Sequence, residues 1–285
     1  MAPQVHIIGA SGRSGVALCR SLLADGVPFV PVVRDPARWA ASGIGVTARI
    51  ADLTDAARLR DTLADATRIV SCAHARHTQA VLAAAPPDAR FVFLGSTRKF
   101  TRWPDAHGNG VLEGEAAFLA SGRSGVMLHP TMIYGAQGED NVQRLAALLR
   151  RLPIVPLPGG GKALVQPIHQ DDVTRAIRAS LARTRDGAHS LVIAGLSPLP
   201  YADLVRAVAA ASGQPAPRIV ALPAGPLMAL AGILRYIPLL PRIQPAEIRR
   251  LLEDKSFDVR PMIDTLGFTP MALREGLART FTGRS

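Results

Sequence analysis

The residues whose spacing most clearly suggests chemistry form the segment Gly9-Ala10-Ser11-Gly12-Arg13-Ser14-Gly15. Glycines at this spacing let the chain turn, let its backbone approach a pyrophosphate, and let the next helix pack on the preceding strand. An apolar run, Val5 to Ile8, precedes the segment, and helical spacing from Val16 to Leu23 follows it. The N–H groups and positive dipole end of that helix would face the phosphates. The pattern predicts a dinucleotide site contacted by Gly9, Ser11, Gly12, Arg13, Ser14 and Gly15.

The end of the second predicted strand, Phe29 to Val33, bears on which cofactor the site takes. In this type of fold an acidic residue about 20 positions past the glycines binds the ribose 2′-hydroxyl of NAD, whereas an arginine there binds the 2′-phosphate of NADP. Arg34 stands in this place, although Asp35 beside it keeps NAD as an alternative. A guanidinium can bind a phosphate through two hydrogen bonds, and Arg38 could contact the same group, so NADP is favoured over NAD. The other interpretation of Arg34 is a strand-end arginine in solvent.

Short apolar runs alternate with segments of helical spacing along the first two thirds of the chain, which is typical of a doubly wound parallel sheet. After the first strand, we expect strands at residues 29–33, 47–50, 68–71, 90–94, 125–129 and 190–193. In open α/β sheets ligands bind beyond the carboxyl ends of the strands. The residues expected there are Asp52, Leu53, Cys72, Ala73, His74 and Ser96. For His74, an exposed loop histidine without a ligand is the alternative.

The domain organisation follows from where this alternation stops. Residues Ile154 to Gly161 are dense in proline and glycine and predict an excursion away from the sheet, and past Gly195 helices with proline-rich joints take over. We therefore expect an α/β fold made of a Rossmann-like doubly wound sheet and a smaller, mostly helical C-terminal substrate domain. The expected NAD(P)-binding domain comprises residues 1–134 and 164–194, and the expected substrate or lid domain comprises residues 135–163 and 195–285.

Composition restricts the partners. The 285-residue chain is 48% hydrophobic and 19% charged, which is typical of a globular protein with a sizeable core. Its 33 basic and 22 acidic residues give a net charge of +11. The arginines are scattered and the few aromatic residues do not interleave with a basic stripe, so nucleic-acid binding is not expected. Two cysteines, Cys19 and Cys72, give neither a disulfide framework nor the spacing of a metal site.

The apolar stretch from Pro223 to Pro241 is interrupted by Pro226, Arg235 and Pro238. It falls short of a clean membrane span of about 20 residues, so it predicts a buried or interfacial helix, with peripheral membrane contact as a weaker alternative. The first strand begins almost at once, which leaves no room for a secretory signal, and we expect a cytoplasmic protein.

These segments together resemble the extended or atypical short-chain dehydrogenase/reductase superfamily, specifically its NAD(P)-dependent epimerase/dehydratase branch. The resemblance implies a Rossmann domain that holds a nicotinamide cofactor, a C-terminal domain that covers the substrate, and a turn at Pro130 and Thr131 near the nicotinamide. Family members often pair through outer helices, so it also makes a homodimer an expectation by analogy. The matching pieces are Gly9 to Gly15, Arg34-Asp35-Pro36, Ala51-Asp52-Leu53, Gly95-Ser96-Thr97, His129 to Gly135, Gln166 to Val173, Asp254 to Asp258 and Leu266 to Pro270.

The sequence departs from the family in the residues that do the chemistry. Family enzymes use a Ser or Thr after the fifth strand, then a Tyr that moves the substrate proton and, four positions later, a Lys that lowers the pKa of the Tyr. Ser96 and Thr97 match the first requirement, but the helix from Val111 to Leu119 has neither Tyr nor Lys, and no Tyr precedes Ile133. The epimerase or dehydratase chemistry of the family therefore does not carry over directly.

Three kinds of substitute remain open: Lys99 as the cation, Tyr134 as the phenol, or Glu113 or Glu115 as an acid or base. The alternatives are a solvated loop lysine, a packed tyrosine ring and solvated helix carboxylates. We take Ser96, Lys99 and Tyr134 as the candidate catalytic residues. The chain is then an NADP-preferring oxidoreductase or epimerase-like enzyme for an unidentified, partly hydrophobic small molecule. The competing hypothesis, motivated by the missing pair, is a non-catalytic NADP(H)-binding sensor or accessory protein.

Overall fold

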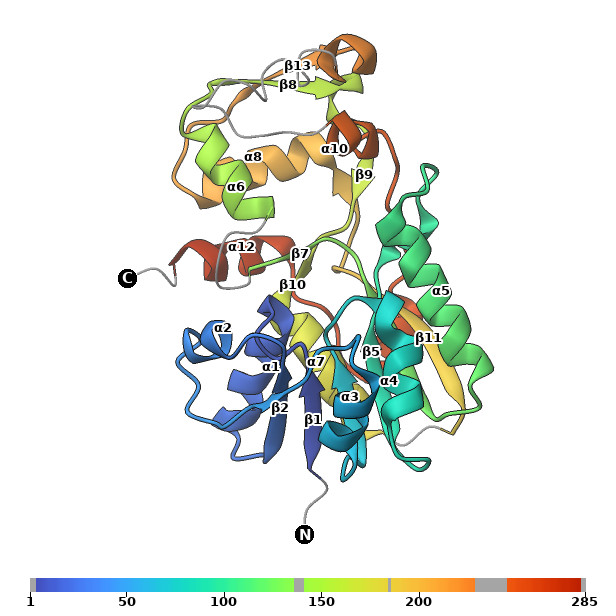
Figure 1. Cartoon of the computed structure of the whole chain (residues 1–285). Helices are drawn as coiled ribbons and strands as arrows, with labels where there is room; N and C mark the ends of the chain where they lie inside the picture. Colours follow the sequence, from blue (N-terminus) through green and yellow to red (C-terminus); the bar gives the residue numbers. More distant parts are fainter. Residues whose placement is uncertain (1–3, 136–140, 184–185, 229–244, 283–285) are drawn as a thin grey trace. The chain divides into compact units, whose positions relative to one another are not determined.

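The computed structural model describes residues 4–135, 141–183, 186–228 and 245–282. The chain forms two compact units (Figure 1). The first comprises Met1–Thr131, Gln170–Ile193 and Arg260–Phe268, and the second comprises Met132–His169, Ala194–Val259 and Thr269–Ser285. This division differs from the expected domain boundaries at residues 132–134, 164–169 and 194, which group with the second unit, and at residues 260–268, which return to the first.

The first unit is built on a seven-stranded sheet with the order β11-β6-β5-β4-β1-β2-β3. Every pairing within it is parallel. The predicted Rossmann-like sheet is thus confirmed, although β3 is shorter than expected and β11 begins earlier. The order reverses between β1 and β4, and at such a switch point α/β proteins place their ligands. The strands are β1 Val5–Ile8, β2 Phe29–Val33, β3 Arg49–Ile50, β4 Arg68–Ser71, β5 Arg90–Leu94, β6 Gly125–Pro130 and β11 Ala188–Ile193.

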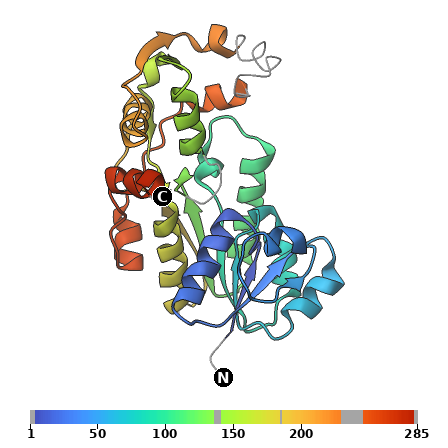
Figure 2. The same cartoon turned by 90° about the vertical axis from the view of Figure 1, so that its left-hand side faces the viewer.

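Helices cover both faces of this sheet (Figure 2). One face carries α1 (Arg13–Ala24), α7 (Gln170–Ala182) and α11 (Arg260–Leu266), and the other carries α3 (Ala56–Leu63), α4 (Thr78–Ala84) and α5 (Ala106–Ala120). On the second face Phe118 of α5 packs edge-on against Phe93, with ring centroids 5.0 Å apart. On the first, the Arg178 guanidinium donates to Ser21 Oγ at 2.7 Å and so ties α7 to α1.

Short elements at the ends of the strands complete the first unit. They are α2 (Pro36–Ala40) and two 3₁₀ turns, η1 (Ala75–His77) and η2 (Thr97–Phe100). They follow β2, β4 and β5 directly, so they lie at the carboxyl edge of the sheet where the sequence predicts the cofactor contacts.

The second unit contains α6 (Asn141–Leu149), α8 (Tyr201–Ala211), α10 (Pro245–Arg250) and α12 (Leu273–Thr282). Val142, Leu145 and Leu149 of α6 pack with Val205 of α8 and Leu277 of α12 in its core. Three two-stranded sheets accompany the helices. They pair β7 (Ile133–Tyr134) with β10 (Ile168–His169), β9 (Leu164–Val165) with β12 (Leu199–Pro200), and β8 (Ile154–Pro158) with β13 (Arg218–Leu222).

The segment Ile154 to Gly161, expected as an excursion away from the sheet, lies outside the seven-stranded sheet and contains strand β8. The prolines of β8 are tolerated because a two-stranded sheet consists only of edges. The region past Gly195, where helices were expected, contains the short strands β12 and β13 besides its helices. None of the described helices is both long and apolar enough to cross a bilayer. The predicted interfacial segment from Pro223 to Pro241 lies outside the described residues beyond Met228.

Candidate functional site

The glycine loop between β1 and α1 has no space for a side chain at Gly9 or Gly15. Gly9 has φ +73°, and a Cβ there would lie 3.0 Å from the amide nitrogen of Ala73. A Cβ on Gly15 would lie 2.3 Å from the carbonyl oxygen of Gly9, far inside any permitted contact. The Gly12 N–H closes the turn by donating to the same oxygen at 2.9 Å. The loop therefore packs helix against strand and presents backbone to whatever binds above it.

The first helix starts without a capping side chain. Its N-cap is Gly12, which makes no side-chain hydrogen bond, and no acidic residue stands in the first turn. Three other helices of this unit begin with an aspartate that accepts from their backbone N–H groups: Asp35 on α2, Asp55 on α3 and Asp105 on α5. Because a helix N-terminus carries partial positive charge, α1 has the open end suited to an anion. The residues present thus fit a dinucleotide pyrophosphate.

Of the loop side chains, Ser14 has a second role. Its hydroxyl donates to Oε1 of the buried Gln170 at 3.0 Å, which ties the first turn of α1 to the first turn of α7. Ser11 is half-buried and Arg13 is exposed.

At the end of β2 the structure separates the two cofactor-selecting candidates. The Asp35 carboxylate accepts from the backbone N–H groups of Ala37 at 2.9 Å and Arg38 at 3.2 Å, so it caps α2. The Arg34 side chain is exposed and has no hydrogen bond or ion pair among the described residues. Across from it, Asp52 Oδ1 accepts from the backbone and hydroxyl of Thr54. These hydrogen bonds, with a contribution from the charge of Arg34, hold the pKa of Asp52 below its usual range.

The end of β4 lies directly against the glycine loop. The Cys72 N–H donates to the carbonyl of Ile8 at 2.9 Å and so continues the β1–β4 ladder by one residue. The backbone of Cys72 and Ala73 is what would collide with a side chain at Gly9. The structure thus brings these predicted contacts together with the loop, through their backbone. Leu53, after β3, packs against the core instead.

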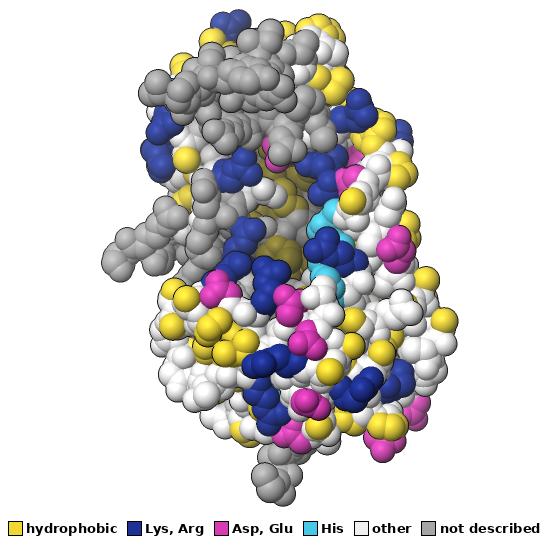
Figure 3. Space-filling model, in the orientation of Figure 1, with side chains coloured by type: hydrophobic (Ala, Val, Ile, Leu, Met, Phe, Trp, Pro, Cys, Tyr) yellow, Lys and Arg dark blue, Asp and Glu magenta, His cyan; other side chains and the backbone are white. Residues whose placement is uncertain are grey.

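His74 meets a second histidine that the sequence did not suggest. Its Nε2 lies 3.1 Å from Nδ1 of His107 on α5, and the rings are perpendicular at 4.4 Å. Burial, followed by the neighbouring His107 and Arg76, lowers the pKa of His74, so the ring is neutral near pH 7. His77 and Arg98 add to this cluster, and Figure 3 shows histidines (cyan) beside basic side chains (dark blue) on one face of the protein. Within the described residues, no group of three or more His, Cys, Asp or Glu side chains is arranged to hold a metal.

Ser96 caps the 3₁₀ turn η2. Its Oγ accepts from the backbone N–H of Arg98 at 3.1 Å, which leaves the hydroxyl proton for a ligand because a serine can donate and accept at once. The Thr97 hydroxyl, by contrast, is buried and donates to the Pro130 carbonyl at 3.2 Å. Pro130 ends β6, and the N–H of the next residue, Thr131, donates to the Ile193 carbonyl at 3.0 Å.

Lys99, a candidate catalytic cation, is bound within the protein. Its Nζ lies 2.5 and 2.6 Å from the two carboxylate oxygens of Glu115 on α5. His129 Nε2 lies 3.1 Å from the same carboxylate, and the Ser190 hydroxyl of β11 also donates to it. We call Lys99, Glu115, His129 and Ser190 the buried charge network. Only 9% of the Lys99 side chain and 12% of the Glu115 side chain are exposed.

The network also fixes the protonation of its members. Burial raises the pKa of Glu115, but hydrogen bonds from Lys99 and Ser190 and the nearby His129 outweigh burial and leave the pKa below its ordinary value. Burial, together with the charge of Lys99, lowers the pKa of His129 to about 4, so its ring is neutral near pH 7. One signal in the sequence could have identified Glu115 as buried, since Val111, Glu115 and Phe118 share one stripe of α5 by their spacing.

The two remaining candidates for the chemistry are a buried, packed tyrosine and an exposed helix carboxylate. Tyr134, in the second unit, is 1% exposed, and its ring meets that of His169 edge-on at 5.2 Å. A Cβ on Gly276 of α12 would lie 2.0 Å from the Tyr134 hydroxyl oxygen, so the ring is packed tightly against that helix. Glu113 is exposed on α5.

Comparison with known proteins agrees with this site. Residues 9–112 match a family model described as NAD(P)H-binding. Combined with the sheet order and the glycine cradle, the match makes the first unit an NAD(P)-binding Rossmann domain. A search of curated proteins found no match to the chain.

Solved structures resemble the chain over nearly its whole length. An NADPH-dependent quinone oxidoreductase from Escherichia coli is 20% identical with a TM-score of 0.75, over 97% of this chain and 99% of its own. MoeE5, solved with UDP-glucose and NAD, is 21% identical with a TM-score of 0.71, over 98% of this chain and 97% of its own. A UDP-glucose 4-epimerase from Thermotoga maritima is 14% identical with a TM-score of 0.74, over 98% and 97%. At these identities the likeness shows the fold, and the neighbours include both NAD and NADPH complexes.

Proposed function

We propose that the protein is an NADP(H)-dependent oxidoreductase that acts on a partly hydrophobic small molecule. The observation that carries the proposal is the pairing of an uncapped, tightly packed glycine cradle with Arg34 at the end of β2. The cradle receives a pyrophosphate through backbone N–H groups. The guanidinium of Arg34 receives the 2′-phosphate of NADP, whereas Asp35, which would accept from the ribose of NAD, is occupied as the cap of α2.

A bound nicotinamide supplies a hydride, so the chain itself needs only to position the substrate and deliver a proton. Ser96 is one proton donor, because its hydroxyl oxygen accepts from backbone and its proton remains available. The His74–His107 pair is a second: the Arg76 N–H donates to Nδ1 of His74, so Nε2–H of His74 faces Nδ1 of His107, and His107 keeps an Nε2 proton that it can give to the substrate oxygen and regain from solvent water. Both groups follow the carboxyl ends of neighbouring strands, β4 and β5. In this proposal Ser96 and the histidine pair take the place of the absent Tyr and Lys, and the carboxyl edge of the sheet holds them in position.

The substrate class is proposed from two sources. Structural neighbours reduce quinones or act on UDP-sugars. The apolar residues between Leu222 and Ile243 favour a substrate with a hydrophobic part over a bare nucleotide sugar. We therefore place quinones and hydrophobic aldehydes ahead of sugar nucleotides.

The test is oxidation of NADPH, followed by absorbance, with a benzoquinone, a long-chain aldehyde or UDP-glucose as acceptor. We expect turnover with a quinone or aldehyde, and a decrease in kcat of about 100-fold in Ser96→Ala or His107→Gln with cofactor affinity unchanged, which is the usual contribution of one acid–base group. Arg60→Gln, on the exposed side of α3, is the matched control. Full activity in both Ser96→Ala and His107→Gln would show that neither residue delivers the proton.

A second function, a non-catalytic NADP(H) sensor or accessory protein, is supported by a different observation. Two predicted substitutes for the missing pair are withdrawn from solvent: Lys99 is paired with Glu115, and Tyr134 is packed against α12. Under this alternative NADPH raises the melting temperature of the protein, and none of the three acceptors oxidises NADPH. Association with a partner protein then depends on whether the cofactor is bound. Arg34→Gln would then weaken both cofactor binding and that association. A partner complex indifferent to NADPH would exclude the sensor.

A further inference from the structure

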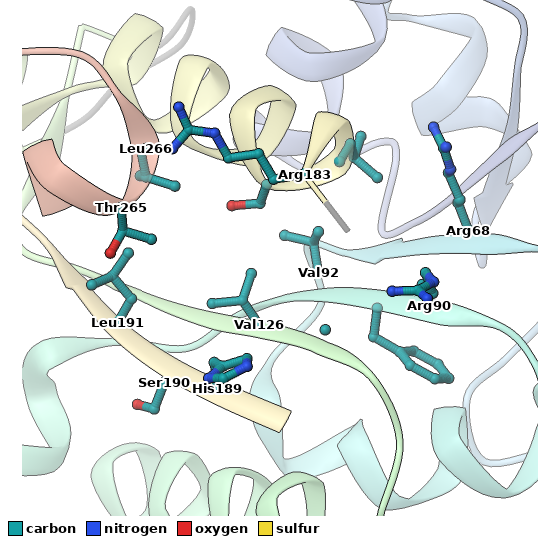
Figure 4. A pocket seen from close by; sticks show the side chains of 14 residues that line it. Arg68, Arg90, Val92, Val126, Arg183, His189, Ser190, Leu191, Thr265 and Leu266 are labelled. Carbon is teal, nitrogen blue, oxygen red and sulfur yellow. The ribbon is translucent and has the colours of Figure 1, made fainter. Parts of the chain in front are cut away.

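A cavity of about 140 Å³ lies within the first unit, at the amino ends of β4, β5, β6 and β11. It is bounded by the sheet on one side and by the last turn of α7 and the end of α11 on the other (Figure 4). The glycine loop follows the carboxyl end of β1, so the cavity opens at the opposite edge of the sheet. Because liquid water takes about 30 Å³ per molecule, the cavity is large enough for a small organic molecule.

The walls of the cavity carry two arginines at one end and a mixture of apolar and polar residues along the rest. Figure 4 shows Arg68 and Arg90 at one end, Val92 and Val126 in the middle, and Leu191 and Leu266 with Thr265 and Arg183 toward the other end. The strand register explains the continuity, since Val92 pairs with Val126 and therefore projects from the same face. This arrangement matches a ligand with a charged end and an apolar body.

The charged end holds two arginines side by side. Arg68 and Arg90 are direct partners in the parallel register of β4 and β5, so their side chains leave the same face of adjacent strands. Like charges in this relationship destabilise a sheet unless something neutralises them. Arg90 pairs at 3.2 Å with Asp186, whose side chain is 93% exposed. Arg68 has no hydrogen bond or ion pair among the described residues, and none of the described residues that line the cavity is an Asp or a Glu.

We propose that this arginine pocket binds a small carboxylic acid with a hydrophobic body. The carboxylate is held by Arg68 and Arg90, because a guanidinium matches a carboxylate with two parallel hydrogen bonds. The body lies along Val92 and Val126 toward Leu191. The site shares no residue with the cofactor cradle, so it acts as a separate ligand site whose existence does not depend on the proposed oxidoreductase activity.

Calorimetric titration of the full chain with benzoate tests the proposal. We expect saturable binding that Arg68→Gln and Arg90→Gln each weaken at least 10-fold, while Arg60→Gln binds as the wild type does. Benzyl alcohol, which lacks the charge, and inorganic phosphate, which lacks the apolar body, should both bind at least 10-fold more weakly than benzoate. Phosphate binding equal to that of benzoate, or equal weakening in Arg60→Gln, would show general attraction of anions to a basic surface and overturn the proposal.

A measurement on the unaltered protein covers the case in which a variant does not fold. Phenylglyoxal modifies accessible arginines, and peptide mass spectrometry locates each modification. Benzoate should protect Arg68 and Arg90 and leave Arg60 reactive. Absence of protection at saturating benzoate, or absence of saturation, would refute the site whatever the variants do. Affinity for NADPH, measured in parallel, should stay unchanged with and without benzoate.

Discussion

The glycine loop and the buried charge network are built in opposite ways within the same unit. The loop, Gly9 to Gly15, works through its glycines, which bring backbone to within contact distance, and its helix starts uncapped. The network works only through side chains, since Lys99, His129 and Ser190 all contact the Glu115 carboxylate in the interior. The first arrangement is open to an anion from outside, whereas the second is closed around its own charges.

This difference assigns different work to the two regions. An open helix N-terminus can bind an anion, whereas a buried set of paired charges holds together the helices and strands that carry those charges. Lys99 lies on η2, which Ser96 caps, while Glu115 belongs to α5 and His129 to β6. The network therefore positions the turn that carries Ser96, and its loss should appear first in stability. Loss of a loop glycine should appear first in cofactor binding.

The largest expected effect comes from opening the closed region. Glu115→Ala leaves the Lys99 ammonium buried without its counter-charge, and breaking a buried ion pair in this way costs about 3–5 kcal/mol of unfolding free energy. Urea unfolding at pH 7 measures the loss. The double variant Lys99→Met/Glu115→Leu, which removes both charges, should recover most of it. If Glu115→Ala is no less stable than the double variant, Lys99 reaches solvent and the region is not closed.

The next largest effect concerns pH. The folded pKa of His129, about 4, lies below its ordinary value of 6.5, so the unfolded chain takes up the proton first as pH falls. Its stabilisation is fully present above pH 6.5 and disappears as pH falls through 4, a difference of about 3 kcal/mol at 1.36 kcal/mol for each pKa unit. Glu115, whose pKa is also lowered, loses its contribution in the same direction, below its ordinary value of 4.5. Unfolding free energies of the wild type and His129→Gln between pH 7.5 and 4.5 should converge in acid. Parallel curves would contradict the buried neutral ring.

The same contrast explains how much of the site the sequence could predict. The loop lies within seven consecutive residues, and each of its requirements is local: a strand, a turn and a helix start. The network joins Glu115 to Ser190, which are 75 positions apart, and no local pattern specifies that pairing. The strands and the Rossmann order were predictable because alternation is also local. β8 was not, because two prolines in five residues normally argue against a strand. His107 was missed because its contact with His74 depends on how α5 returns beside η1.

A side chain added to the glycine loop tests whether the loop holds the cofactor. Gly15→Ala puts a Cβ 2.3 Å from the Gly9 carbonyl oxygen, so the loop must shift away from the position that receives the pyrophosphate. We expect the Kd for NADPH, measured by fluorescence quenching, to rise about 100-fold, or about 2.7 kcal/mol. Gly45→Ala is the matched control, because a Cβ at Gly45 meets nothing within 4 Å. Unchanged affinity in a folded Gly15→Ala protein would mean that the loop does not hold the cofactor.

The smallest effect separates the two nicotinamide cofactors at the rim of the open region. Arg34→Gln removes a charge that faces the proposed 2′-phosphate, while Asp35 stays engaged with α2. The Kd for NADPH should rise about 10-fold, equivalent to about 1.4 kcal/mol, and the Kd for NADH should stay the same, because a charge-assisted hydrogen bond to phosphate is lost and no contact to the ribose hydroxyl changes. Arg60→Gln, which removes an equal charge from the same unit, controls for the general potential of a protein with net charge +11. An equal loss for both cofactors would assign Arg34 to the shared part of the molecule, and a loss for NADH alone would reverse the proposed preference.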